Sequence, residues 1–589
     1  MHWHAWFTLA VTLVSLFLLA REAYAPANIM LGAVITLLLV RVITPAEAFA
    51  GFGNSAPITV AALYILARAV DKVGLMQPVL AVLLRGTRGN GSLARLTVPS
   101  AAASAFLNNT PLIAMMIPSV TDWAERTRQS PSRYLMPLSY AVILGGVVTM
   151  IGTSTNLVVS GLLDAKTGQP MSLFEITPFG LPVAVVGIVV LTLTAARLLP
   201  ERRPARTDLG HEAREFSVSM RVLQNGPLSE RTVEEAGLRN LQGVFLVEIE
   251  RETETIAPVA SNTVLRGGDR LCFVGRVDQV VDLQMMRGLE SFEQQHLAAF
   301  DTARHTFFEA VVGATSPLVG KTLKEIQFRE RYQAAVLAIH RAGQRINAKL
   351  GDVEIRVGDT LLLLADPGFR SRWRDRTDFL LVSQLGGSAP GVTRKAWLVA
   401  AILVAVVVVA GSGMLPMLEV SLLAAVALVG FGVLTGTEAR NAVDLDVVLM
   451  VAASFGLGAA MEGSGLASVL AGGIIGAFKG WGTLGVLFGV ILATSLVTEV
   501  VTNNAAAAIV FPIAYTAAIK VGADPRVFAL VVATMASTSF LTPIGYQTNT
   551  MVFGPGGYRF SDFARLGAPI TLSVIVVILL VARFWFGIG

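Results

Sequence analysis

Amide and hydroxyl side chains interrupt apolar segments of this chain at two places that resemble each other. Residues 106–111 (FLNNTP) place two asparagines and a threonine inside the apolar stretch 98–117. A second pair of asparagines, in residues 500–505 (VVTNNA), opens another apolar run. Polar groups in hydrocarbon require partners, so such interruptions are tolerated only where they are buried in protein or line a cavity. Their side chains are therefore candidates to bind a small solute.

A second interruption follows in each half of the chain. Residues 149–156 (TMIGTSTN) match residues 542–549 (TPIGYQTN). Asn156 lies 47 residues after Asn109, and Asn549 lies 45 residues after Asn504. Paired interruptions at corresponding places of two halves are the best sequence indication of a transporter's substrate site. The pattern therefore predicts a secondary transporter.

The chemistry available at these interruptions is the binding of ions by neutral ligands. Amide and hydroxyl groups, with backbone N–H groups at helix N-termini, can replace the hydration shell of an anion. Amide oxygens and unwound carbonyls suit a hard cation instead. The candidate anion ligands are Asn108, Asn109, Thr110, Thr153, Ser154, Thr155, Asn156, Asn503, Asn504, Thr548, Asn549 and Thr550. The candidate coupling-cation ligands are Ser104, Asn109, Gly152, Glu499, Asn504 and Gly545, the glycines because they permit close approach of the backbone. The alternative is that these asparagines and threonines cap helices or join them.

Glu499 is the acidic residue in the core of a broken element, and alignment of the two Asn-Asn pairs places Ser104 opposite it. A carboxylate within a membrane marks a functional site by default. Glu499 is thus expected to hold a coupling cation or to carry a proton. The alternative is a protonated carboxyl group bonded to a neighbour such as Thr498.

The composition places most of the chain in lipid. Of its 589 residues, 53% are hydrophobic and 15% charged, whereas soluble domains average about 25% charged. The net charge of +5 does not indicate nucleic acid, because the arginines flank apolar segments, as orientation signals do. A single cysteine, Cys272, excludes a disulfide framework. The six histidines lie outside the interruptions, and no nucleotide loop or nucleophile–base arrangement is found, so we expect a protein that is not an enzyme and has no cofactor.

Two membrane regions, residues 1–206 and 391–589, repeat each other over most of their length. Residues 44–48 (TPAEA) recur as 435–439 (TGTEA), and Gly74 recurs as Gly465, both 391 positions later. Residues 79–84, flanked by arginines, are expected to form a short interfacial helix. The basic segment 200–206 predicts that the following region is cytoplasmic.

The intervening region is itself duplicated. Charges become dense and apolar runs shorten to strand length, as in 244–249, 271–274, 335–339 and 360–364. Pro-Leu, Arg and Gly-Asp positions recur 90 residues apart, which predicts two tandem α/β modules, 207–297 and 298–390. Arg266 and Arg356 recur in register and mark a candidate site for a small regulatory ligand, with a solvated position as the alternative.

At these residues the chain resembles the divalent anion:sodium symporter family, within the ion-transporter superfamily. That resemblance implies two inverted repeats, each with a re-entrant hairpin ending in a Ser-Asn-Thr motif and a later unwound helix. Asn108-Asn109-Thr110 and Asn503-Asn504-Ala505 stand where those motifs would, with Ser replaced twice and one Thr lost. The insert resembles two C-terminal modules of regulators of potassium conductance, as in the sulfate-transporter-like and sulfur-acclimation branch.

The sequence thus predicts a polytopic α-helical membrane protein that imports a small divalent oxyanion coupled to Na⁺ or H⁺, with sulfate before dicarboxylate. A cation–proton antiporter with Glu499 as its titrating group is the alternative on the same architecture, and a sensor that transports little is a third. We expect a homodimer in contact with membrane lipid, in a bacterial inner membrane, with the insert in the cytoplasm and no nucleic-acid partner.

Overall fold

The computed structural model divides the chain into a helical unit and an insert. Residues 1–201 and most of 388–589 form the helical unit, and residues 202–387 form the insert. The structure describes residues 3–21, 24–76, 90–127, 129–200, 217–224, 226–238, 244–251, 254–275, 288–291, 306–313, 316–341, 344–346, 350–366, 368–373, 378–384 and 393–589. The expected interfacial helix 79–84 and most of the basic segment 200–206 lie outside these residues.

The first half of the helical unit has two unwound segments between its helices. Its elements are α1 (Trp3–Ala20), α2 (Pro26–Leu39), α3 (Pro45–Phe49), η1 (Ala50–Gly53), α4 (Ser55–Lys72), α6 (Asn90–Ser104), α7 (Asn109–Arg126), α8 (Ser132–Gly146), α9 (Ser154–Thr167) and α10 (Thr177–Leu198). The chain is unwound between α6 and α7 and again between α8 and α9. Both unwound segments coincide with the interruptions seen in the sequence.

The second half contains the same succession. Its elements are α15 (Ala396–Gly411), α16 (Met417–Gly430), α17 (Gly436–Ala442), α18 (Leu445–Gly463), α19 (Leu466–Phe478), η3 (Lys479–Trp481), α20 (Gly482–Thr498), α21 (Asn503–Lys520), α22 (Pro525–Ala536), α23 (Gln547–Phe553) and α24 (Phe560–Phe584). The chain is unwound between α20 and α21 and between α22 and α23.

Local structure repeats where the sequence repeats. Thr44 and Glu47 form a capping box at α3, and Thr435 and Glu438 form the same box at α17. Gly74 and Gly465 both adopt positive φ values, 68° and 78°, that favour glycine. The 391-residue offset therefore relates positions with the same backbone geometry.

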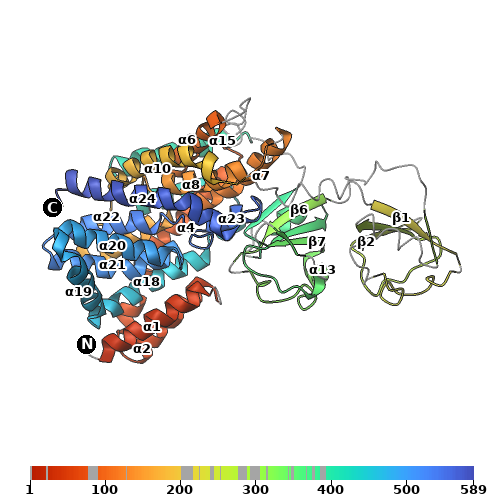
Figure 1. Ribbon diagram of the computed structural model, residues 1–589, viewed down its shortest axis with the longest axis horizontal. Helices are drawn as coiled ribbons and strands as arrows, with labels where there is room; N and C mark the ends of the chain where they lie inside the picture. The colour runs from red at the N-terminus through yellow and green to blue at the C-terminus, as the bar shows by residue number, and fades with distance from the viewer. Residues whose placement is uncertain are drawn as a thin grey trace. The chain divides into compact units, whose positions relative to one another are not determined.

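The two halves also pack on each other reciprocally. Helix α4 packs against α16, and α18, which corresponds to α4, packs against α2, which corresponds to α16. In the same way α9 contacts α21, and α23 contacts α7. The last helix of each half, α10 and α24, lie side by side (Figure 1). Exchange of the halves leaves this contact pattern unchanged.

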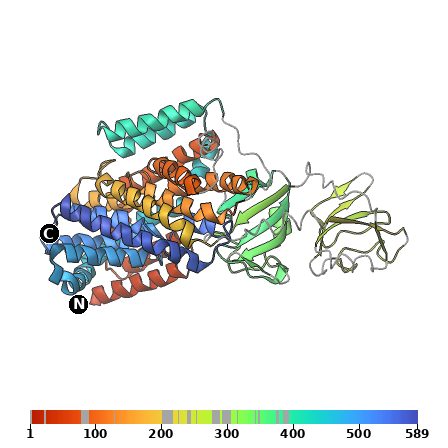
Figure 2. The same ribbon diagram turned by 45° about the horizontal axis from the view of Figure 1, so that its top comes forward.

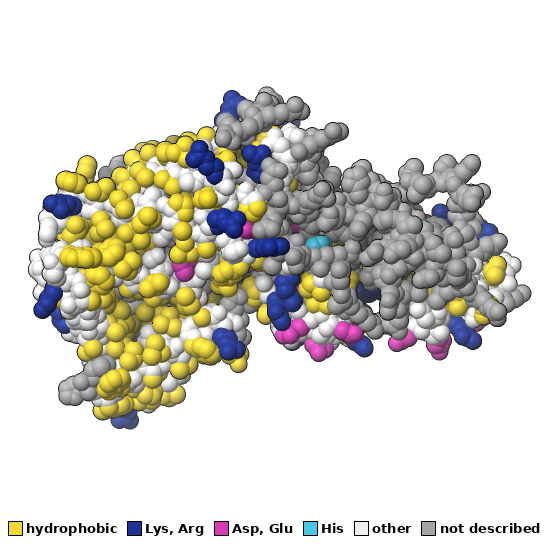
Figure 3. Space-filling view, viewed as in Figure 1, with side chains coloured by type: hydrophobic (Ala, Val, Ile, Leu, Met, Phe, Trp, Pro, Cys, Tyr) yellow, Lys and Arg dark blue, Asp and Glu magenta, His cyan; other side chains and the backbone are white. Residues whose placement is uncertain are grey.

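Apolar surface is what a helical unit needs in order to lie in lipid. Among the described residues, six helical segments are long and apolar enough to cross a membrane, namely Trp3–Ala20, Pro45–Lys72, Thr177–Leu198, Leu445–Gly463, Leu466–Thr498 and Phe560–Phe584. Hydrophobic side chains cover most of the face of the helical unit seen in Figure 3.

The insert contains two sheets, which are visible in Figure 2. Each has five strands, in the same order. The first runs β3-β2-β4-β1-β5 and the second β8-β7-β9-β6-β10 when read from the matching edge, and the pairings are antiparallel. The elements are β1 (Ser217–Val222), β2 (Val244–Glu250), β3 (Thr255–Ile256), β4 (Arg270–Gly275), β5 (Leu289–Ser291), β6 (Thr306–Val311), α13 (Phe328–Tyr332), β7 (Ala334–Arg341), β8 (Gln344–Arg345), η2 (Leu350–Asp352), β9 (Thr360–Ala365), α14 (Phe369–Trp373) and β10 (Leu381–Gln384). All four strand-length apolar runs are strands, and β2 and β7 carry a register shift at the same place.

The 90-residue repeat reproduces one ion pair, between a partly exposed arginine and a buried aspartate, in each half of the insert. Arg251 forms two hydrogen bonds to the Asp269 carboxylate, and Arg341 does the same with Asp359. These hydrogen bonds raise the pKa of both arginines above the ordinary value. The aspartate in turn accepts from the backbone N–H of Arg266 or Arg356. The recurring Gly-Asp is thus a structural feature of each module, and ligand binding by Arg266 and Arg356 stays a prediction.

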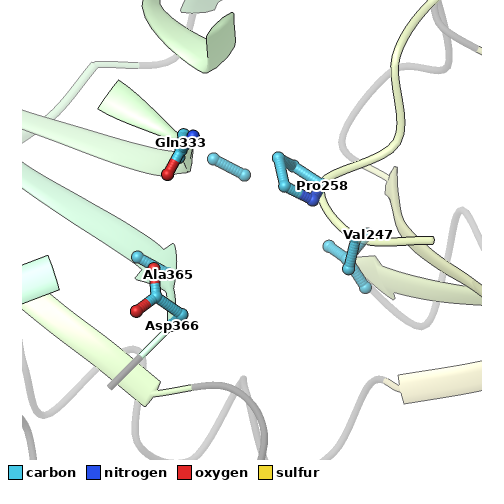
Figure 4. A pocket seen from close by; sticks show the side chains of 7 residues that line it. Val247, Pro258, Gln333, Ala365 and Asp366 are labelled. Atoms are coloured by element: carbon cyan, nitrogen blue, oxygen red, sulfur yellow. The ribbon is translucent and has the colours of Figure 1, made fainter. Parts of the chain in front are cut away.

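One pocket of about 310 Å³ opens between the two sheets of the insert (Figure 4). Val247 and Pro258 line it from the first module, and Gln333, Ala365 and Asp366 line it from the second.

Candidate functional site

The site is built from two turns and two unwound segments. We call residues 104–110 the first tip and residues 498–504 the second tip, because each joins the end of one helix to the start of the next. We call residues 147–153, between α8 and α9, the first break, and residues 537–546, between α22 and α23, the second break. Three helices of 14 to 18 residues, α7, α9 and α21, begin at these segments. Their N-termini carry partial positive charge.

Asn109, the first residue of α7, is 1% exposed and surrounded by polar atoms. One end of its amide lies 2.5 Å from Ser104 Oγ, 3.2 Å from the Val142 carbonyl oxygen and 3.3 Å from the Gly152 carbonyl oxygen. Its other end lies 2.6 Å from the Tyr546 hydroxyl. With the amide nitrogen toward the carbonyls, the oxygen accepts from Tyr546 and both ends are satisfied.

The second tip contains the same arrangement one residue earlier than the sequence alignment places it. Thr498 Oγ1 lies 3.1 Å from Asn503 Oδ1, as Ser104 Oγ lies beside Asn109, and the partners are five positions apart in each pair. The structural equivalents are therefore Ser104 with Thr498 and Asn109 with Asn503. Alignment of Ser104 with Glu499, and of Asn109 with Asn504, is wrong, because α7 begins at the second asparagine of its pair and α21 at the first.

Each tip contacts the broken helix of the other half. Asn504 Oδ1 accepts hydrogen bonds from Ser154 Oγ at 3.2 Å and from Thr155 Oγ1 at 3.0 Å, at the start of α9. Thr110 Oγ1 in turn lies 3.2 Å from Gln547 Oε1, at the start of α23. The contact of Thr110 with Gln547 is thus the counterpart, with the two halves exchanged, of the contact of Asn504 with Ser154. The structure thus brings Asn109, Thr110, Ser154, Thr155, Asn503 and Asn504 together, with Thr153 beside them.

Tyr546 lies where the first tip and the first break meet, and the sequence prediction did not include it. Its hydroxyl lies 2.6 Å from Asn109 Nδ2 and 3.2 Å from Thr153 Oγ1. Its side chain is 8% exposed. The signal was present in the aligned interruptions, where Tyr546 occupies the position of Thr153.

The remaining asparagines of the breaks hold unwound backbone. Asn156 Nδ2 donates to the Thr149 carbonyl at 2.9 Å, and Asn549 Nδ2 donates to the Ser539 and Thr542 carbonyls at 3.1 and 3.4 Å. Such bonds replace those that a continuous helix would make. Three further hydrogen bonds engage other candidate ligands. Ser139 Oγ donates to Thr548 Oγ1, Thr550 Oγ1 donates to the Pro543 carbonyl, and the Thr110 N–H donates to Asn108 Oδ1. Anion binding by Asn108, Asn156, Thr548, Asn549 and Thr550 stays a prediction.

Glu499 binds the backbone of the second break. Its Oε1 accepts from the N–H groups of Phe540 and Leu541 at 2.8 and 3.0 Å, and its Oε2 accepts from that of Thr542 at 2.9 Å. The Thr542 hydroxyl donates back to the Glu499 carbonyl oxygen at 2.9 Å. Glu499 therefore anchors the unwound backbone of the second break. A coupling-cation role for Glu499 stays a prediction.

Two glycines allow the breaks to approach the tips. A Cβ on Gly152 would lie 2.4 Å from the Gly146 carbonyl oxygen and 2.8 Å from that of Ser104. A Cβ on Gly545 would lie 2.8 Å from the carbonyl oxygen of Thr498, the structural equivalent of Ser104. Any side chain at either position would therefore push a break away from its tip.

Broken apolar helices that bury neutral polar groups between two similar halves define a polytopic membrane transporter. Comparison with known proteins is consistent with this class. A family model described as "Citrate transporter" matches residues 16–533, and one described as "Sodium:sulfate symporter transmembrane region" matches residues 498–588. The chain belongs to the divalent anion:sodium symporter family of membrane transporters, and is not an enzyme.

Full-length relatives carry related names. A "Putative sulfur deprivation response regulator" of Chlamydomonas reinhardtii is 36% identical, over 95% of this chain and 98% of the relative. An "Uncharacterized transporter" of Synechocystis is 35% identical, over 99% of this chain and 97% of the relative. "Sodium/sulfate cotransporter 2" of Chlamydomonas reinhardtii is 25% identical, over 98% of this chain and 89% of the relative.

Proposed function

We propose that this protein is a cation-coupled symporter of a small divalent oxyanion, with sulfate favoured over dicarboxylates. The observation that carries the proposal is the convergence of both tips with the N-terminus of α9 on neutral amide and hydroxyl groups. Relatives named sodium/sulfate cotransporters support the choice of Na⁺ and sulfate.

The anion is bound by amide and hydroxyl groups that are hydrogen bonded to one another in this structure. Asn504, Ser154 and Thr155 join the second tip to α9, and Asn109 joins the first tip to Tyr546. A desolvated anion takes N–H and O–H donors from these groups and from the N-termini of α7, α9 and α21. Neutral donors bind the anion without a buried cationic side chain, whose attraction would oppose release.

The first coupling cation is bound by the amide oxygen of Asn109. If the amide turns over, its oxygen faces Ser104 Oγ and the carbonyl oxygens of Val142 and Gly152, so four oxygens converge as a hard cation requires. The amide nitrogen then points toward Tyr546 and the anion. The cation thereby fixes Asn109 as an anion donor, which couples the two binding events. Thr498, Asn503 and the Ala536 carbonyl form the equivalent set in the second half.

The architecture proposed for this function is a pair of inverted repeats whose tips are re-entrant and meet near the bilayer midplane. The reciprocal packing of α4 with α16 and of α18 with α2 supports it. The insert is proposed to be cytoplasmic and to resemble potassium-conductance regulator modules, in a homodimer of a bacterial inner membrane. An antiporter would require Glu499 to exchange protons, and both of its carboxylate oxygens are engaged by backbone N–H groups, which favours the symporter.

Uptake by the full-length protein in proteoliposomes tests the function. Radiolabelled sulfate should accumulate when an inward Na⁺ gradient is imposed, and succinate should accumulate less. Asn109→Asp keeps oxygen ligands for the cation but removes the N–H donors, so Na⁺ should still raise its melting temperature while sulfate uptake is lost. Proton efflux driven by Na⁺ without anion uptake would reject the symporter and favour the antiporter.

A further inference from the structure

The hydroxyl of Tyr546 contacts two of the candidate anion ligands, Asn109 and Thr153. This hydroxyl is bonded to the first tip through Asn109, at 2.6 Å, and to the first break through Thr153, at 3.2 Å. These partners lie on two separate segments, so the hydroxyl end of the ring is fixed between them. Its side chain is 8% exposed and its partner Asn109 is 1% exposed, so the ring lies inside packed protein.

This tyrosine is one of three positions at which the two aligned interruptions differ. Residues 149–156 and 542–549 pair Thr149 with Thr542, Gly152 with Gly545 and Asn156 with Asn549. Tyr546, however, stands opposite Thr153, so a phenol ring replaces a side chain of three heavy atoms. The second break therefore narrows the site with a ring, whereas the first break has only a small side chain at the equivalent position.

We propose that Tyr546 sets the size of the transported anion, admitting a compact tetrahedral oxyanion and excluding a longer dicarboxylate. This inference rests on the proposed symport of a divalent oxyanion. Packed protein accommodates extra volume poorly, so a ring held in place excludes anions that extend into its volume. Movement of the ring would break its hydrogen bonds to Asn109 and Thr153 at once.

The hydroxyl of Tyr546 has a separate role from the ring. A phenol O–H both donates and accepts, so it can bond Asn109 when no anion is bound and donate to an anion oxygen when one is. Loss of the hydroxyl should therefore weaken binding of every anion, whereas loss of the ring should change which anions fit. Substitutions that remove the hydroxyl alone, or the ring, therefore distinguish an effect on the size of the anion from an effect on its hydrogen bonding.

Uptake of sulfate and succinate by the full-length protein in proteoliposomes, under an inward Na⁺ gradient, provides the measurement. Tyr546→Thr makes the two breaks alike, and Tyr546→Val removes the ring without supplying a hydroxyl. In both, the ratio of sulfate to succinate uptake should fall at least about tenfold, the lower range for discrimination by pocket shape. Tyr546→Phe should keep the ratio while lowering both rates. Tyr515→Thr, in α21 and stacked on Phe511, is the matched control and should leave the ratio unchanged.

Each outcome bears on the proposal. An unchanged ratio in Tyr546→Thr or Tyr546→Val, with sulfate still transported, would overturn it, as would a change in Tyr546→Phe as large as in Tyr546→Thr. If both small variants fail to fold, the native protein provides the test. Malonate, succinate and glutarate should then compete with sulfate uptake less and less strongly as their chain length grows. A native protein that takes up none of these anions would overturn the proposed function, and this inference with it.

Discussion

Replacement of Glu499 by glutamine tests whether this buried carboxylate is an anchor or an ion carrier. Glutamine keeps one oxygen, which can still accept from the N–H groups of Phe540 and Leu541. The second oxygen becomes an NH₂ group that faces the N–H of Thr542, so a hydrogen bond of 2.9 Å is replaced by two opposed donors.

The expected cost follows from these three contacts. An unsatisfied buried donor costs about 1–3 kcal/mol, and the change of two charge-assisted bonds to neutral ones costs roughly 0.5–1 kcal/mol each. The second break should thus lose about 2–5 kcal/mol of stabilisation. Because Tyr546 belongs to this break, Glu499→Gln should lower both the melting temperature and the maximal rate of anion uptake.

The assay pairs thermal melting of the purified protein with the cation-to-anion stoichiometry of uptake. If Glu499 is an anchor, melting temperature and rate fall while the stoichiometry stays at the native value. The exposed Glu419→Gln, in the first turn of α16, is the matched control and should change neither measurement. Normal melting together with an altered stoichiometry would refute the anchor and assign Glu499 to the coupling ion.

Three further outcomes are expected. Asn503→Ala should reduce anion affinity roughly tenfold to a hundredfold, measured as the concentration giving half-maximal uptake, whereas the exposed Asn441→Ala should match the native protein. Burial opposes ionisation of Glu438, but hydrogen bonds from Lys72 and Thr435 outweigh it and lower the pKa of Glu438 to about 2. This contribution to stability should be complete above the unfolded pKa of about 4.3 and be lost as pH falls toward 2, and Lys72→Met should reduce that loss in acid melting curves. Replacement of residues 207–390 by a flexible linker should leave transport measurable, and loss of the dimer on size-exclusion chromatography would make the insert an assembly clamp.

The sequence determined where helices break and where structure repeats. Interruptions such as 106–111 and 542–549 are visible locally, because clustered polar side chains with glycine or proline disfavour a continuous apolar helix. The capping boxes at Thr44 and Thr435 are local as well, since each needs only a threonine three residues before a glutamate. The two sheets of the insert followed from strand-length apolar runs in register.

Tertiary structure decided which polar groups meet. Two adjacent asparagines look alike in sequence, and only the helix starts show that Asn503 corresponds to Asn109. The contact of Tyr546 with Asn109 joins residues 437 positions apart, which no local pattern specifies. The partners of Glu499 are backbone N–H groups, which carry no residue identity, so their arrangement exists only once the second break is unwound and packed. Spacing therefore located the site, whereas packing of one half against the other assigned a partner to each side chain.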